Sequence, residues 1–413
     1  MKDIPQAAFF TLSLWMFWRL YKKPKLTNLV AACLAFAVSY NSKINAVFIL
    51  LITFAFLIFT YISRYKSIVI PKNIIPNLFR NPIGILKQVQ DDVKTSVQYD
   101  IKTKIIYFYF ILAPLFAFLL WSIFWENPIG RLLEAFHTYT TSTTNMPLLY
   151  FGKIVYSGQN VPWHYPLGLL AVTTPILIII FFLIGLYSLV RWRKLKLEAR
   201  IFLFLWLTIP LSRYLKPHMI IIDDIRHFME AVYPLSAIAG IGMYRFYLTM
   251  TIILHSIIPR INKLFISFLY LLFVICYLLF QNISYHPYQT SYYNELIGGI
   301  KGAQGKFDVE FWAHPYKQAL FYLNSNAPLN SKVTIPMAPD VAALYLRNDL
   351  KTQVNKENLA SVDPKIYEKS DYIVVLNRQS FFDWYGITPY IKNHLPIYSL
   401  SLDGVPLVSI YKN

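Results

Sequence analysis

The segment Lys216–Glu230, KPHMIIIDDIRHFME, concentrates ionisable side chains between two apolar runs, Ile201–Leu211 and Phe228–Tyr247. Its ionisable residues are Lys216, His218, Asp223, Asp224, Arg226, His227 and Glu230. Charged groups beside a hydrocarbon phase are costly, so they commonly face a polar cavity or a pathway. The alternative interpretation is an ordinary hydrated loop whose acidic and basic residues pair with each other. Features of the rest of the chain are needed to choose between the polar-cavity and the hydrated-loop interpretations.

The composition indicates a polytopic membrane protein. Of the 413 residues, 56% are hydrophobic, 17% are aromatic and only 15% are charged, and the mean hydropathy is +0.42. Apolar runs long enough to cross a bilayer recur along the chain. A soluble domain rarely combines such runs with so high a hydrophobic fraction and so low a charged fraction. The formal net charge is +18. We expect no nucleic-acid partner, because the basic residues cluster in loops on one side, where membrane orientation and anionic lipids explain them.

Apolar length predicts an all-α membrane domain with about eight transmembrane helices over residues 1–281. The expected helices are Pro5–Tyr21, Thr27–Tyr40, Ala46–Ile62, Ile105–Trp125, Leu167–Val190, Ile201–Leu211, Phe228–Tyr247 and Leu264–Leu279. Lys and Arg cluster in the loops at 19–25, 64–104, 191–200 and 245–263. The positive-inside rule assigns these loops to the cytoplasm, and it places Met1–Ile4, Lys43, 126–166, 216–227 and the residues after Gln281 outside. We therefore expect a multi-pass protein of a bacterial-type inner or plasma membrane.

The composition changes after Gln281, where residues 282–413 predict a small extracytoplasmic α/β domain. Helical spacing is found at Tyr316–Asn326 and Asp340–Arg347, and KVTIP, Lys332–Pro336, is typical of a strand. The two strongest strand patterns are DYIVVLN, Asp371–Asn377, and VPLVSIYK, Val405–Lys412.

Two candidate site residues lie near the N-terminus. Asp3 precedes Pro5 at the start of the first helix, where a carboxylate can bind a metal or assist a base. It can also simply favour the helix dipole. Lys43 occupies the tight turn SYNSKIN and can bind phosphate, or it can extend its ammonium toward water.

The remaining candidates lie in predicted outer loops. Arg226 offers a planar fork that suits phosphate oxygens, His227 can donate to the same group, and Asp224 can orient Arg226. Lys216 adds a positive charge to the same loop, although the loops predicted to lie outside are otherwise poor in basic residues. Trp163, His164 and Tyr165 precede an apolar helix, where such residues anchor at the membrane interface or stack on a sugar ring.

Four segments in this order give the chain a family resemblance. They are Lys2–Leu50, Pro162–Leu186, Asp223–Gly242 and Tyr292–Pro328. With them the chain resembles the GT-C type integral-membrane glycosyltransferases, in particular the protein O-mannosyltransferases and aminoarabinose transferases (glycosyltransferase family 39-like). The resemblance implies a polyprenyl-phosphate sugar as donor, membrane lipids around it, and a hydroxyl acceptor on a protein, lipid or glycan. It leaves open whether a divalent metal takes part.

The resemblance also implies roles for single residues. Asp3 resembles a secondary acidic residue of the family, Arg226 and His227 resemble its basic position beside the lipid phosphate, and Lys43 resembles a recurrent lysine at the same turn. From their places in the chain we also expect Lys216 to bind the donor phosphate, and Asp224, Trp163, His164 and Tyr165 to support the site. The family's first outer loop, which carries the principal base, has no counterpart here, so we expect a chain that lacks its N-terminal part. The alternatives are a non-catalytic membrane remnant or scaffold, and a transporter of lipid-linked glycans.

Overall fold

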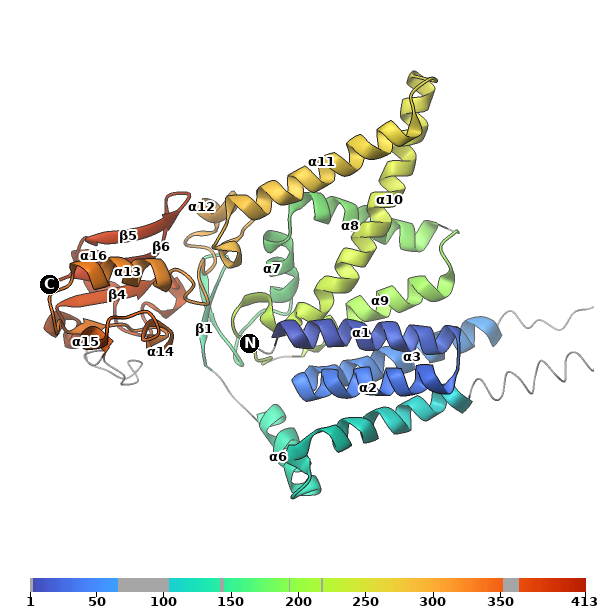
Figure 1. The fold of residues 1–413 in the computed structure, drawn as a ribbon, viewed down its shortest axis with the longest axis horizontal. Helices are drawn as coiled ribbons and strands as arrows, with labels where there is room; N and C mark the ends of the chain where they lie inside the picture. The colour runs from blue at the N-terminus through green and yellow to red at the C-terminus, as the bar shows by residue number, and fades with distance from the viewer. Residues whose placement is uncertain (1–2, 66–103, 142–144, 193, 217, 352–363) are drawn as a thin grey trace, which may run out of the picture. The chain divides into compact units, whose positions relative to one another are not determined.

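The computed structural model describes residues 3–65, 104–141, 145–192, 194–216, 218–351 and 364–413. Over these residues the chain is mostly helical, with a small sheet region (Figure 1). It forms two compact units. Unit 1 contains Met1–Ser142, Leu186–Arg213 and Phe228–Ile238, and unit 2 contains Thr143–Gly185, Tyr214–His227 and Ala239–Asn413.

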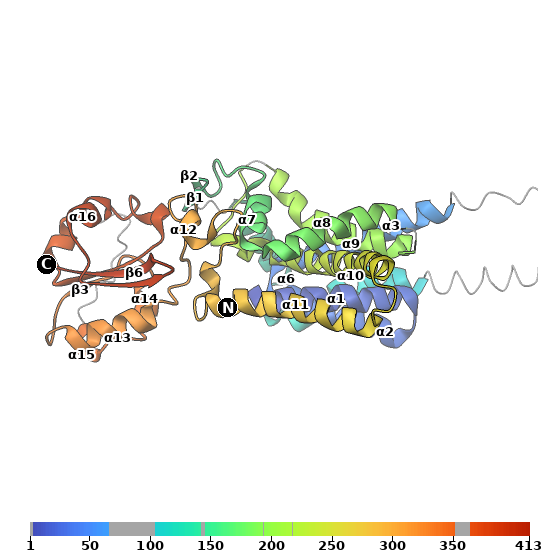
Figure 2. The same cartoon turned by 90° about the horizontal axis from the view of Figure 1, so that it is seen from above.

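Unit 1 is a bundle of apolar helices. Its helices are α1 (Asp3–Lys22), α2 (Leu26–Ser42), α3 (Val47–Tyr65), Lys104–Leu120 and α9 (Leu197–Ser212). Helix α1 packs against α2 and α3, and α3 packs against α9 (Figure 2). Phe10, Leu14 and Phe17 repeat at helical spacing and are fully buried, so one face of α1 forms the core.

Most of the predicted apolar helices are present, but the prediction of a single helix over Leu167–Val190 is wrong. The chain forms α7 (Tyr165–Thr173) and α8 (Ile176–Arg191), with Thr174 in an extended conformation between them. Pro175 explains the break, because it cannot donate a backbone hydrogen bond and it disfavours helix at the residue before it. The run that starts at Ile105 also ends early, at Leu120, and a separate helix α6 (Pro128–Thr141) follows.

Three helices in the described part of the chain are long and apolar enough to cross a membrane. They cover Ile44–Ser63, Ile225–Ile257 and Lys263–Ser284. The shorter apolar helices are Leu26–Ser42, Lys104–Leu120 and Ile176–Arg191. The expectation of membrane helices is therefore supported in its coarse form, and the number of about eight spans stays a prediction.

In unit 2, α8 and the long helix α10 (Val232–Ile257) approach each other closely. A side chain at Gly242 would meet the carbonyl oxygen of Phe181 at 1.8 Å, so the contact requires glycine. Phe181 also packs with Ala239 of α10 and with Val274 of α11 (Lys263–Ser284). A small residue thus permits a helix contact that the apolar pattern alone does not specify.

A two-stranded hairpin follows α6 along the chain. Strands β1 (Pro147–Tyr150) and β2 (Lys153–Tyr156) pair antiparallel around Phe151 and Gly152, whose φ angles are 49° and 78°. Two positive φ angles in a two-residue loop match the twist of the flanking strands.

The C-terminal residues form a four-stranded sheet in the order β3-β4-β6-β5. Its strands are β3 (Val333–Thr334), β4 (Tyr372–Leu376), β5 (Tyr398–Leu402) and β6 (Val405–Lys412). Strand β3 pairs parallel with β4, and the other neighbours pair antiparallel. Alternate residues of β4 enter two different cores, since Val374 packs beside α13 (Tyr316–Asn326) whereas Val375 packs beside α16 (Thr388–Asn393).

The predicted elements of this domain are largely present. The helix at Tyr316–Asn326 and the strands within Lys332–Pro336, Asp371–Asn377 and Val405–Lys412 are confirmed. The helix predicted at Asp340–Arg347 is wrong in extent. Only α14 (Pro339–Ala342) forms there, and the next short helix, α15, covers Asn348–Lys351.

Candidate functional site

The first residue of α1 carries a buried carboxylate. Asp3 is only 9% exposed, and it accepts a hydrogen bond of 2.8 Å from Nζ of Lys43. Lys43 has an extended backbone conformation between α2 and a short 3-10 helix, Ile44–Ala46. The structure therefore brings together two residues that the sequence proposed separately.

A second ion pair lies in the same unit. Glu230 is fully buried, and its Oε1 lies 3.2 Å from Nη2 of Arg213 and accepts from Nδ2 of Asn45 at 3.4 Å. Arg213 also lies over the ring of Phe48, 5.3 Å from its centre. Asn45 comes two residues after Lys43 along the chain, so its contact with Glu230 links the two ion pairs.

We call Asp3, Lys43, Asn45, Arg213 and Glu230 the unit 1 polar cluster, and buried Gln6 lies about one turn after Asp3 on α1. The cluster and Gln6 have unused hydrogen-bonding atoms. Among the described residues, Nε2 of buried Gln6 and Oε2 of Glu230 have no hydrogen-bond partner. Buried polar atoms are nearly always paired, so such atoms indicate a place for water or a ligand. The sequence pointed to Asp3 and Lys43 but not to the roles of Arg213, Asn45 and Glu230.

Unit 2 contains a separate group of charged residues around Asp223. Its carboxylate lies 3.1 Å from Nη1 of Arg226 and 2.8 Å from Nη2 of Arg378. The backbone of Asp223 has a φ of 55°, a left-handed conformation that Asp tolerates better than most residues. Two guanidinium groups are thus held on one carboxylate, and we call Asp223, Arg226 and Arg378 the guanidinium group.

Aromatic rings cover both arginines. Arg226 lies over Trp312 at 5.3 Å, and Arg378 lies over Phe381 at 4.3 Å from the ring centre. Nε of Arg378 has no hydrogen-bond partner among the residues that the structure describes. Arg378 was not predicted as a site residue because it lies in the C-terminal part of the chain, although its position two residues after the buried strand β4 was a usable signal.

Asp308 binds the segment that follows Arg378 along the chain. Its side chain is almost fully buried and accepts from the backbone amide of Leu149, and from the amide and hydroxyl of Ser380. Burial raises the pKa of the Asp308 carboxyl above its ordinary value, while Arg378 and the hydrogen bonds from Ser380 and Leu149 act in the opposite direction. Asp308 therefore ties the β1–β2 hairpin to the segment that follows Arg378.

The other candidate residues, in the loops predicted to lie outside, have different surroundings. Lys216 is exposed, and the backbone carbonyl of His227 accepts from the hydroxyl of Tyr214 at 2.9 Å. The side chain of Asp224 lies outside the described residues. Asp3 and Lys43 belong to unit 1, whereas Lys216, Arg226 and His227 belong to unit 2. A single site that unites the two sets stays a prediction.

The aromatic segment before α7 is partly a packing feature. Tyr165 is buried against Tyr150, and Nδ1 of His164 lies 2.8 Å from the hydroxyl of Tyr150. Trp163 is 58% exposed, as an interfacial anchor or a stacking platform requires. Within the described part of the chain, no group of three or more His, Cys, Asp and Glu side chains is arranged to hold a metal ion.

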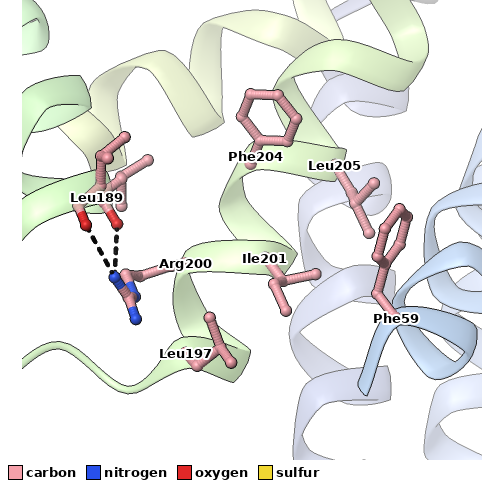
Figure 3. Close-up of a pocket in the computed structure, with 8 residues that line it drawn as sticks. Phe59, Leu189, Leu197, Arg200, Ile201, Phe204 and Leu205 are labelled. Atoms are coloured by element: carbon pink, nitrogen blue, oxygen red, sulfur yellow. Dashed lines mark hydrogen bonds between the residues drawn. The ribbon is translucent and has the colours of Figure 1, made fainter. Parts of the chain in front are cut away.

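A cavity of about 270 Å³ in unit 1 has a different character (Figure 3). It is lined mainly by apolar side chains of α3, α9 and the end of α8, among them Phe59 and Phe204. Arg200 reaches to its edge and donates to the carbonyl oxygens of Leu189 and Val190, at 3.1 and 3.2 Å (Figure 3). These bonds satisfy carbonyls at the C-terminal end of α8, which is a structural use of the arginine.

No protein-family model matches this chain, and no curated protein matches it. Function is therefore inferred from the residues and their geometry.

Proposed function

We propose that this chain is a multi-pass membrane glycosyltransferase that moves a sugar from a polyprenyl-phosphate donor to a hydroxyl acceptor at the outer membrane face. The observation that supports it best is the unit 1 polar cluster. Two buried carboxylates each pair with a cation whose side chain is at most 20% exposed, beside apolar helices. Ionisable groups in such positions are costly and commonly serve a substrate site.

The ion pairs of unit 1 support the proposed sidedness. Asp3 and Lys43 belong to segments that the distribution of Lys and Arg assigns to the outside, and they meet each other. Lys22 and Glu198 belong to two basic loops that it assigns to the cytoplasm, and they also meet. Each of these contacts therefore joins two segments that are predicted to lie on the same side of the membrane, as a multi-pass topology requires.

The proposed chemistry uses both kinds of charge. As the bond from the anomeric carbon to the phosphate oxygen breaks, negative charge grows on the leaving phosphate. Lys43 and Arg213 would stabilise that charge in a site with little water. The acceptor oxygen forms the new bond to the anomeric carbon, and its proton passes to a carboxylate, for which Asp3 and Glu230 are the candidates.

The guanidinium group of unit 2 offers a further anion site. Arginine binds phosphate through two parallel N–H donors, and Asp223 holds Arg226 and Arg378 next to each other. We propose that this group binds an anion, in line with the phosphate-binding role that the family resemblance implies for Arg226.

A labelling experiment tests the transferase. Membranes from cells that express the full chain receive a radiolabelled polyprenyl-phosphate sugar, and the label that reaches an acceptor is counted. We expect Lys43→Met to reduce the label by roughly 100-fold, the usual cost of losing one charge-stabilising donor. Lys22→Met is the matched control, because it removes a paired lysine at the other end of α1. It should keep most of the activity.

The competing scaffold hypothesis gives a different result. A scaffold would transfer no label in the unsubstituted protein, and its thermal unfolding would still be cooperative. Equal labelling by Lys43→Met and the unsubstituted protein would also contradict the proposed site. Thermal unfolding of each variant shows whether a loss of label reflects a loss of fold.

A further inference from the structure

Unit 2 contains a cavity of about 340 Å³ at the C-terminal end of α11. Its polar lining consists of Gln281, Asn282, Tyr285, Gln289 and Tyr292. Two apolar residues complete the lining, and neither cluster described above contributes to it. The volume lies at the lower end of the roughly 300–1,000 Å³ of small-molecule pockets. A ligand of one or two rings would fill it.

The lining has the chemistry of a site for a neutral, hydroxyl-rich molecule. Three carboxamides and two phenols supply donors and acceptors, and none of the lining residues carries a formal charge. The rings of Tyr285 and Tyr292 pack edge to face, with centres 4.9 Å apart. Their apolar surfaces suit the C–H face of a sugar ring, while the carboxamides suit its hydroxyls.

Part of this hydrogen-bonding capacity is unused. The hydroxyl of Tyr292 is buried and has no hydrogen-bond partner among the described residues. Two carboxamides have partners, since Gln281 donates to the Glu295 carboxylate and Nε2 of Gln289 lies 3.0 Å from Nδ1 of His286, whereas the contact from Gln289 to Oδ1 of Asn282 is 3.5 Å long, at the limit of a hydrogen bond. By contrast, the hydroxyl of Tyr285 donates to the carbonyl of Tyr293 at 3.1 Å, which fixes its ring. The cavity thus combines a fixed ring with an unpaired hydroxyl.

We infer that this cavity binds a neutral saccharide, with the Tyr292 hydroxyl and the carboxamides of Asn282 and Gln289 as its hydrogen-bonding groups. The inference goes beyond the proposed transfer reaction and does not depend on it. A glycan acceptor and a free sugar share this chemistry, and both would enter in the same way.

Binding is measured on the purified full chain by saturation-transfer NMR. The probes are the methyl glycosides of glucose, galactose and mannose, and maltose. Glycerol 3-phosphate serves as a lipid-headgroup probe. We expect saturable binding of at least one saccharide with a Kd of about 1–10 mM, typical of a small polar ligand with few contacts. Binding of none of the four saccharides, or of glycerol 3-phosphate alone, overturns the inference.

Two variants and one control locate the binding. Tyr292→Phe keeps the ring and removes the hydroxyl, so it should weaken binding roughly 5-fold, the effect of one hydrogen bond. Tyr322→Phe is the matched control, because Tyr322 stacks on Tyr398 in the C-terminal sheet, and it should bind as the unsubstituted chain does. The double change Asn282→Ala and Gln289→Ala should weaken binding further, and unchanged binding by both variants overturns the assignment.

No sugar donor is present in this measurement. Failure of the labelling experiment therefore leaves the saccharide result standing, and failure here leaves the transferase proposal standing.

Discussion

The two ends of α1 each carry an ion pair, and the pairs differ in their surroundings. The helix has 20 residues, so its ends are about 30 Å apart. At its first residue, Asp3 and Lys43 have side chains that are 12% and 20% exposed. At its last residue, Lys22 pairs with Glu198, and these side chains are 35% and 24% exposed. Lys22 also lies over the rings of Trp18 and Tyr21.

The difference shows which property of an ion pair indicates function. Lys22 and Glu198 are reached by water, and such pairs contribute about 0–1 kcal/mol. Asp3 and Lys43 belong to the unit 1 polar cluster, where Arg213 and the fully buried Glu230 add a second pair. A buried pair adds little net stability, yet breaking it is costly. Burial next to other charges, more than pairing itself, therefore marks the candidate site.

The largest effect is expected from Arg213→Ala. It leaves the carboxylate of Glu230 buried without its arginine, which should reduce the free energy of unfolding by about 3–5 kcal/mol. Thermal unfolding followed by tryptophan fluorescence in detergent measures the change. The double variant Arg213→Met and Glu230→Leu removes both charges and should recover much of the loss. A double variant as unstable as Arg213→Ala would contradict this account of the pair.

A pH dependence of stability is expected from Asp308, a buried carboxylate of unit 2. Burial raises its pKa above the ordinary value of 3.8, so the folded chain keeps this proton at pH values where the unfolded chain has lost it. The contribution to stability is fully present below 3.8 and is lost as the pH rises toward the raised pKa. Asp308→Asn removes this titration, so its Tm should fall less between about pH 4 and pH 7. Parallel Tm profiles of the two proteins would refute the assignment.

The smallest effect is expected from Lys22→Ala at the more exposed end of α1. The change should cost at most about 1 kcal/mol, and added salt should reduce the difference further, because exposed charges are screened. Thermal unfolding at low and high salt measures both. A loss as large as that of Arg213→Ala would remove the contrast between the two ends.

Much of the fold was predictable because helices and strands leave local patterns. The buried face of α1 repeats at helical spacing, and β4 is a continuous apolar run that is buried on both faces. The break at Pro175 was also readable, but the apolar length around it outweighed the proline. Strand β5 was missed, although YSLSL alternates apolar and polar residues. Its hydroxyls made the run less apolar than a typical strand.

The candidate site was predictable only in part. The sequence singled out Asp3 and Lys43 because each charge stands beside an apolar run. It also singled out Arg226, but it did not identify Arg378, which pairs with the same Asp223 carboxylate. No local pattern links residues so far apart along the chain.

The sequence by itself determined the apolar helices, the α/β tail and the positions of the unusual charges, since these depend on local composition and spacing. Only the tertiary structure decided that Glu230 meets Arg213 and Asn45, and that two arginines share Asp223. Partners of this kind are selected by the packing of whole helices and strands. That packing depends on the shapes and buried surfaces of many residues at once.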